Sequence, residues 1–133
     1  MSASIHRTEI QMRFGDTDAL GHVNNASFAS YTEVARLEFF RGLGESVRSL
    51  ILASLYIDYR RQVKFDESMH VLTWIDKLGT SSITLCQTIF AANELAADVR
   101  SVVVHFDYAA AKPQPLTADI RSRLSPYVRV RPA

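Results

Sequence analysis

The sequence predicts an α+β protein, in which one face of an antiparallel sheet of about five strands is covered by one long helix. Three observations lead to this prediction. One segment, from Ala26 to about Gly42, repeats apolar residues at helical spacing. Five other segments alternate apolar and polar residues with a period of two. Short turns separate the last four of these segments, which is typical of an antiparallel meander.

Length and composition limit the class of protein. The chain has 133 residues, so we expect a single domain that spans residues 1–133. Its formal net charge of +1 gives no indication of a nucleic-acid or membrane partner, and we expect neither. Cys86 is the only cysteine, which excludes an intrachain disulfide. Because the first seven residues lack the apolar run of a signal peptide, and no segment has the ~20 apolar residues that span a bilayer, we expect a cytoplasmic protein.

The first strand is expected from Thr8 to Phe14, where every second residue is apolar. Residues 15–25 are then dense in glycine, aspartate and asparagine, which marks turns and the start of a helix. The long helix follows, with Asn24 or Asn25 as its N-cap and Gly42 or Gly44 at its end.

The apolar stripe of this helix is expected to be wide. Residues recur at intervals of three and four along one face, and two more apolar residues widen it. The recurring residues are Phe28, Tyr31, Ala35 and Phe39, and the widening residues are Val34 and Leu37. A wide stripe predicts a helix that packs deeply against the sheet.

Alternation returns from Leu55 to Phe65, and further strands are expected over residues 69–78, 82–91 and about 97–108. Residues 112–115 contain two prolines and are expected to end the sheet. Thr117 is the expected cap of a short helix over about 118–124. A lone sheet leaves its edge strands unpaired, which favours a dimer that joins two sheets.

The loop before the long helix contains the strongest candidates for catalytic residues. Asp16 and Asp18 come just before a helix N-terminus, where free N–H groups and the helix dipole favour negative charge. A carboxylate beside such an oxyanion donor is the minimum equipment for attack on a thioester carbonyl. Two other interpretations remain open. Both aspartates could serve only turn and capping hydrogen bonds, or they could bind a divalent metal together with His22, which is a less specific pattern.

Other candidate residues carry weaker signals. Arg60 and Lys64 would share the polar face of the strand expected over 55–65, where they could contact phosphates or simply be solvated. His105 lies between two apolar residues and is expected to be structural or to face a dimer partner. No Gly-x-Ser-x-Gly setting supports a serine hydrolase.

Residues 13–25, with an aspartate-x-aspartate, a glycine three residues later and a run His22-Val23-Asn24 into the helix, resemble the entry loop of the 4-hydroxybenzoyl-CoA thioesterase-like hotdog proteins. The helix segment 31–36 is similar to the family's aromatic-x-Glu-x-Ala-Arg segment. The stretches 57–67, 78–82 and 112–124 also look like family segments, so the resemblance covers nearly the whole chain.

The resemblance implies a hotdog fold, a curved antiparallel sheet wrapped around one long helix. It also implies hydrolysis of an acyl-CoA thioester, or of an acyl carrier protein thioester, by a homodimer or homotetramer without metal or organic cofactor. Asp18 would be the nucleophile or general base, and the backbone N–H near Asn25 would polarise the carbonyl. His22, Asn24 and Arg60 are the expected substrate-binding residues. A non-catalytic acyl-CoA-binding protein and a hotdog enoyl-CoA hydratase are the alternatives.

Overall fold

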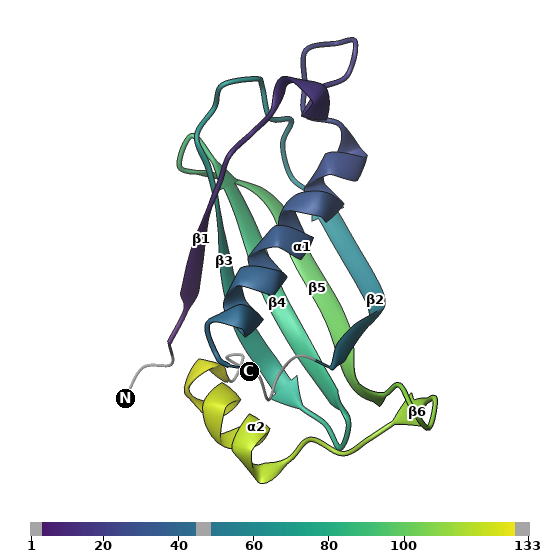
Figure 1. Cartoon of the computed structure of the whole chain (residues 1–133). Coiled ribbons are helices and arrows are strands. Elements are labelled where there is room, and N and C mark those ends of the chain that lie inside the picture. The colour runs from purple at the N-terminus through teal and green to yellow at the C-terminus, as the bar shows by residue number, and fades with distance from the viewer. Residues whose placement is uncertain (1–3, 45–48, 130–133) are drawn as a thin grey trace.

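A computed structural model of the chain describes residues 4–44 and 49–129. A six-stranded antiparallel sheet has the order β1-β3-β4-β5-β2, and β6 pairs with the end of β5. The strands are β1 (His6–Ile10), β2 (Leu50–Tyr59), β3 (Met69–Leu78), β4 (Ser82–Ala91), β5 (Glu94–Asp107) and β6 (Lys112–Pro113). Figure 1 shows α1 (Asn25–Arg41) lying lengthwise across one face of this sheet, with α2 (Ala118–Leu124) at its lower end. The predicted α+β class is therefore confirmed.

Helix α1 begins and ends where the local chemistry favours it. The Asn24 side chain accepts a 2.9 Å hydrogen bond from the Ala26 N–H, which satisfies one of the free donors of the first turn. At the other end, Gly42 N–H donates to the carbonyl of Glu38. The cap residue predicted from the sequence thus places the helix start directly after the loop that carries Asp16 and Asp18.

The buried stripe of α1 differs from the expected one. Val34 and Leu37 are 49% and 53% exposed, so the prediction that they widen the stripe was wrong. The stripe widens instead toward Thr32 and Arg36, which lie four residues apart on the side that faces the sheet. Their polar groups are accommodated because Arg36 Nη1 donates to Thr32 Oγ1 at 3.1 Å.

Two apolar clusters fill the space between α1 and the sheet. The first lies under the loop and the start of α1, where Phe28 packs with Val23 and Val63. The second surrounds Phe39 and joins the end of α1 to α2. Burial of a side chain such as Phe28 stabilises the fold by about 1.5–3 kcal/mol. The first cluster therefore gives the loop a fixed apolar floor.

Several expected boundaries agree with the structure and others do not. The strands over 69–78 and 82–91 and the helix over 118–124 have the predicted limits. The first strand ends at Ile10, because the chain turns there toward a 3₁₀ turn, η1 (Phe14–Asp16). Residues 112–113 pair with β5, although the segment 112–115 with its two prolines was expected to end the sheet.

Strand β2 also ends earlier than expected, at Tyr59. Beyond it the chain is an extended loop in which Val63 is fully buried and its carbonyl accepts the Val23 N–H at 2.8 Å. An extended loop with one buried side alternates like a strand, which explains the error. Arg60 and Lys64 therefore do not share one strand face.

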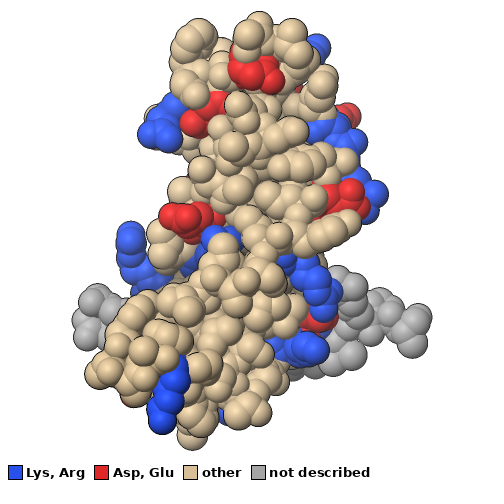
Figure 2. Space-filling model, turned by 90° about the vertical axis from the view of Figure 1, so that its right-hand side faces the viewer, with Lys and Arg blue, Asp and Glu red and all other residues tan. Residues whose placement is uncertain are grey.

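Strand β2 forms one edge of the sheet and is nearly uncharged. Its ten residues include a single charged side chain, Asp58, while Leu52 and Tyr56 are well exposed. Figure 2 views the molecule from this side, and the middle of the view is largely free of charged residues.

The helices in the described part of the chain are too short or too polar to span a membrane.

Candidate functional site

The loop between η1 and α1 is a compact turn held by its own backbone. Asp18 N–H donates to the carbonyl of His22 at 2.8 Å, and Gly21 N–H donates to the carbonyl of Asp18 at 3.1 Å. Gly21 has a φ of +80°, a conformation that glycine adopts without a steric penalty. Thr17 and Val23 pair across the base of the turn. The turn therefore presents Asp18 close to the start of α1.

The Asp18 side chain is exposed and partly engaged. Its Oδ1 accepts hydrogen bonds from the Leu20 N–H at 2.9 Å and from the His22 N–H at 3.3 Å. These two donors orient the carboxylate as an Asx turn does. Both bonds go to the same oxygen, and no hydrogen bond from the described residues reaches the second oxygen.

Asp18 borders a pocket of about 240 Å³ between the loop, the start of α1 and the chain that follows β2. This pocket brings together four of the residues predicted from the sequence: Asp18, His22, Asn25 and Arg60. The rest of its lining consists of Val23, Phe28, Tyr59, Arg61 and Gln62. Asn24, the fifth predicted residue, does not line the pocket, because its side chain caps α1.

The start of α1 offers one backbone donor at this pocket. Ala26 N–H is taken by the Asn24 side chain, and Ser27 N–H donates to the Asn24 carbonyl at 2.9 Å. Among the described residues the Asn25 N–H has no hydrogen-bond partner, and Asn25 borders the pocket. Since the first-turn N–H groups carry partial positive charge, this end of the helix favours an oxygen that becomes negative.

His22 borders the pocket, and one of its ring nitrogens is buried without a partner among the described residues. Its backbone pairs with Lys64 in a short bridge, which joins the loop to the chain after β2. Its buried Nδ1 has no hydrogen-bond partner among the described residues. A buried polar atom without a partner is uncommon and is often satisfied by a ligand or a water molecule.

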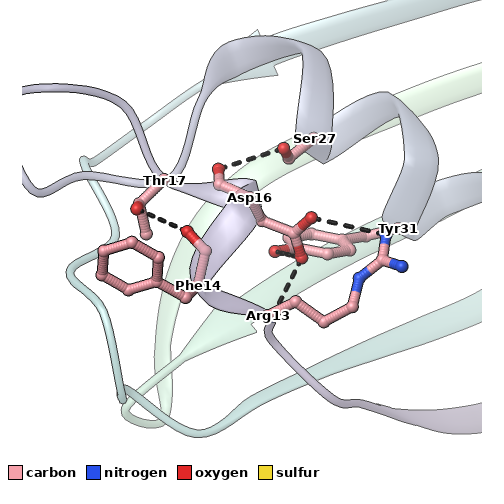
Figure 3. A network of polar contacts seen from close by, with 6 residues as sticks. All are labelled: Arg13, Phe14, Asp16, Thr17, Ser27 and Tyr31. Carbon is pink, nitrogen blue, oxygen red and sulfur yellow. Dashed lines mark hydrogen bonds and ion pairs between the residues drawn. The ribbon is translucent and has the colours of Figure 1, made fainter.

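Asp16 lies in a different environment from Asp18. Figure 3 shows its carboxylate pointing toward Tyr31, whose hydroxyl donates to Oδ2 at 2.8 Å. The Arg13 N–H donates to the same oxygen at 3.0 Å. Burial acts to raise the pKa of Asp16, but these two hydrogen bonds and the charge of Arg13 together hold it below its ordinary value. Asp16 therefore has a structural setting, whereas Asp18 faces the pocket.

This difference bears on the metal-site interpretation of Asp16, Asp18 and His22. The Asp16 carboxylate accepts from Tyr31 and Arg13, while the Asp18 carboxylate accepts from the turn. In the described part of the chain, residues 4–44 and 49–129, no three His, Cys, Asp or Glu side chains form a group that could hold a metal ion.

The remaining predicted residues are placed as follows. Arg60 Nη2 lies 2.9 Å from Asp58 and Nε lies 3.0 Å from Asp98, so its charge is balanced by two carboxylates. His105 is buried, and its Nδ1 lies 3.1 Å from the carbonyl of Pro115. The structural interpretation of His105 therefore agrees with its contacts.

Sequence reasoning did not identify Tyr59 as a pocket residue. Its hydroxyl donates to the carbonyl of Asn25 at 3.0 Å, and its ring meets Phe28 edge to face at 5.2 Å. Gln62 was also missed, because the strand was expected to continue to Phe65. The adjacent pair Arg60-Arg61, two long polar residues in succession, was the available signal that alternation had ended.

Comparisons with known proteins agree on one family. A family model described as the thioesterase-like superfamily matches residues 12–124. The acyl-CoA thioester hydrolase YbgC of Escherichia coli O6:H1 is 27% identical over 90% of this chain and 96% of its own length.

Two solved structures have the same fold. A predicted thioesterase from Bacillus stearothermophilus superimposes with a TM-score of 0.89 at 28% identity, over 97% of this chain and all of its own. A thioesterase from Thermus thermophilus, solved in complex with coenzyme A and zinc, has a TM-score of 0.85 at 32% identity, over 96% of each chain.

Proposed function

Because this chain belongs to the thioesterase-like superfamily, we propose that it is an acyl-CoA thioesterase that works with Asp18 at the start of α1. One observation carries the proposal. Asp18, whose carboxylate is exposed, and Asn25, whose N–H has no partner among the described residues, line the same pocket. A carboxylate and an oxyanion donor that face one cavity are the groups that thioester hydrolysis requires.

The reaction converts a thioester and water into a carboxylic acid and the free thiol. The substrate carbonyl oxygen would accept the hydrogen bond of Asn25 N–H and gain negative charge as the carbonyl carbon is attacked. As a general base, Asp18 would take a proton from the attacking water. As a nucleophile, it would form a mixed anhydride, expel the thiolate, and be released by water. A general base contributes ~10²–10⁴-fold and one oxyanion donor ~10²–10³-fold, so the pair supplies substantial catalysis.

The other predicted site residues have distinct parts in this proposal. His22 would contact the substrate, because it lines the pocket beside Asp18. Asn24 would act through the helix cap, which leaves the adjacent Asn25 N–H available. Arg60 would contact the polar end of the substrate only if it releases one of its two carboxylate partners.

We further propose a homodimer that pairs the edge strands β2 of two copies. Strand β2 is unpaired on one side and carries one charged residue in ten, whereas exposed edges are normally protected by charges or proline. Tyr59 lies at the end of β2 and lines the pocket, so a partner sheet would extend the pocket wall. A homotetramer would need a second surface, and the exposed Val34 and Leu37 of α1 are apolar residues that it could cover.

The substrate class follows from the relatives. YbgC is named an acyl-CoA thioester hydrolase, and the Thermus thermophilus thioesterase binds coenzyme A. An acyl carrier protein thioester is a close variant, since its reacting group is the same. A cytoplasmic location remains the expectation from the sequence.

The proposal is tested by thiol release. The purified protein is incubated with short-chain, long-chain and aromatic acyl-CoAs, and the free thiol of CoA is measured with a thiol reagent. We expect catalytic turnover for at least one class. Binding of acyl-CoA without thiol release would indicate a binding protein, and consumption of an enoyl-CoA without thiol release would indicate a hydratase. Either result would contradict the proposed function.

A further inference from the structure

We infer that Asp16 and Tyr31 are positioning residues, which attach the Asp18 loop to α1 and so fix Asp18 relative to the Asn25 N–H. The inference deepens the proposed function and rests on it for the catalytic role of Asp18. Neither residue lines the pocket, so both would act through Asp18 and Asn25 rather than on the substrate.

Asp16 is hydrogen-bonded both to the start of its own turn, η1, and to the start of α1. Its carboxylate accepts hydrogen bonds from Tyr31, on the second turn of α1, and from the Arg13 N–H. Its carbonyl accepts the Asn24 N–H at 2.8 Å. The same carbonyl accepts the Ser27 hydroxyl at 3.1 Å (Figure 3). Asp16 therefore receives four hydrogen bonds, three of which come from the N-cap and first two turns of α1.

The residues that make these bonds are close in sequence to the proposed reacting groups. Asp18 follows Asp16 by two residues, and Asn25 follows Asn24 directly. The bond between Asn24 N–H and the Asp16 carbonyl thus links the two segments that carry the carboxylate and the oxyanion donor. A misplacement of ~1 Å at a reacting group can cost ~10²-fold in rate, so such a link has a direct effect on turnover.

The pair is held in the protonation states that it needs. Burial, the hydrogen bond to Asp16 and its negative charge all raise the pKa of Tyr31, so the hydroxyl remains a donor. The pKa of Asp16 lies below its ordinary value, so its carboxylate remains charged near neutral pH. A hydrogen bond to a charged acceptor is about twice as strong as a neutral one. Tyr31 is 5% exposed and Asp16 is 9% exposed, so water does not readily replace either partner.

The experiment compares Tyr31→Phe with the control Tyr108→Phe in the full chain, since Tyr108 is exposed and lies outside both the pocket and β2. We expect Tyr31→Phe to remain folded and to lose at least ~10-fold in kcat with KM within about twofold, because the missing bond displaces the transition-state geometry rather than the binding surface. The amide signals of Leu20 and His22, which donate to Asp18 Oδ1, should shift in an NMR spectrum. The control should change neither quantity.

Two variants at Asp16 add a rescue test. The amide of Asp16→Asn still offers an oxygen to the Tyr31 hydroxyl, whereas Asp16→Ala offers none. We expect Asp16→Asn to retain more turnover than Asp16→Ala at equal folded fraction. If Tyr31→Phe does not fold, Ser27→Ala removes one hydroxyl bond to the Asp16 carbonyl and should show the same NMR shifts and a smaller loss of kcat.

The outcomes separate this inference from the proposed function. Normal kcat and unmoved Leu20 and His22 signals in folded Tyr31→Phe would overturn the positioning role, whatever Asp18→Asn does. A loss confined to KM would overturn it as well. Moved signals in a protein without thioesterase activity would support the positioning role and contradict the proposed function.

Discussion

The hydroxyl of Tyr59 donates a 3.0 Å hydrogen bond to the carbonyl of Asn25, which joins the end of edge strand β2 to the first residue of α1. The Tyr59 ring also meets Phe28 edge to face. One side chain thus connects the proposed dimer edge, the helix start and the apolar floor of the pocket. A structural change at the β2 edge is therefore expected to alter the geometry of the pocket.

The Tyr59→Phe variant tests this connection. It removes the hydroxyl and keeps the ring against Phe28, so the expected loss in the free energy of unfolding is at most about 1 kcal/mol. Urea unfolding at one fixed protein concentration measures this loss. Tyr56→Phe is the control on the same strand, and equal losses in the two variants would count against a stabilising Tyr59–Asn25 bond.

The proposed dimer predicts that a charge in the middle of the β2 edge weakens association. Ser54→Lys would place like charges near each other across two antiparallel copies of β2, which is destabilising. Sedimentation velocity at micromolar concentration should show a dimer or tetramer for the natural chain and a shift toward monomer for the variant. Ser122→Lys, on the exposed face of α2, is the control. A monomeric natural chain with full activity would rule the dimer out.

The stability of the protein should fall as the pH drops below the ordinary pKa of histidine. His70 is buried and stacks on Phe90 at 5.0 Å. Its burial, together with the charge of Arg7, lowers its pKa from the ordinary value of 6.5, and Glu9 only partly opposes this. The unfolded chain then binds a proton that the folded chain does not, so the stabilising contribution is complete above pH 6.5 and is lost toward the lower folded pKa.

Urea unfolding at a series of pH values between about 5 and 6.5 measures this effect, since the carboxylates with lowered pKa titrate below that range. The His70→Gln variant should show a flatter dependence than the natural chain. An unchanged slope would mean that another group is responsible.

Turnover is expected to survive exhaustive chelation. The Asp16 carboxylate is engaged by Tyr31 and Arg13, so Asp16 and Asp18 do not present a joint ligand set with His22. The assay is thiol release after dialysis against EDTA. Loss of activity that a divalent metal restores would contradict this expectation and return these three residues to consideration as ligands.

Much of the fold could be predicted from the sequence because its signals are local. The period of two gave β3 and β4 their limits, and Asn24 marked the start of α1. The resemblance of residues 13–25 to the hotdog thioesterases is confirmed by the family match and by the solved structures. The errors arose where tertiary packing, and not the local pattern, determines which side chains are buried. Val63 alternates like a strand residue but lies in an extended loop that packs against the core, and Arg36 is buried despite its charge.

The candidate site was predictable in part for the same reason. Asp18, His22 and Asn25 are close in sequence, so one loop and one helix start bring them together. Residue type alone does not separate the two aspartates of the motif: the resemblance selected Asp18, and the fold then places Tyr31 against Asp16. Tyr59 comes from a distant strand, and no local pattern predicts that its hydroxyl reaches Asn25.

The role of Asp18 is tested most directly by the Asp18→Asn variant. The amide oxygen can still accept the Leu20 and His22 N–H groups, so the turn should persist. Asp16→Asn is an unsuitable control, because it disturbs the bond to Tyr31. Asp66→Asn is better matched, since Asp66 is exposed in a neighbouring turn with a φ of 73°, a conformation that asparagine also adopts.

The decisive measurement is the single-turnover rate of acyl-CoA hydrolysis for Asp18→Asn and Asp66→Asn, with the melting temperature and acyl-CoA affinity of each. We predict that Asp18→Asn stays folded, binds acyl-CoA and loses at least ~10²-fold in rate, because an amide is neither a nucleophile nor a useful base. Asp66→Asn should hydrolyse at nearly the natural rate. Near-normal hydrolysis by Asp18→Asn would contradict a catalytic role for this carboxylate.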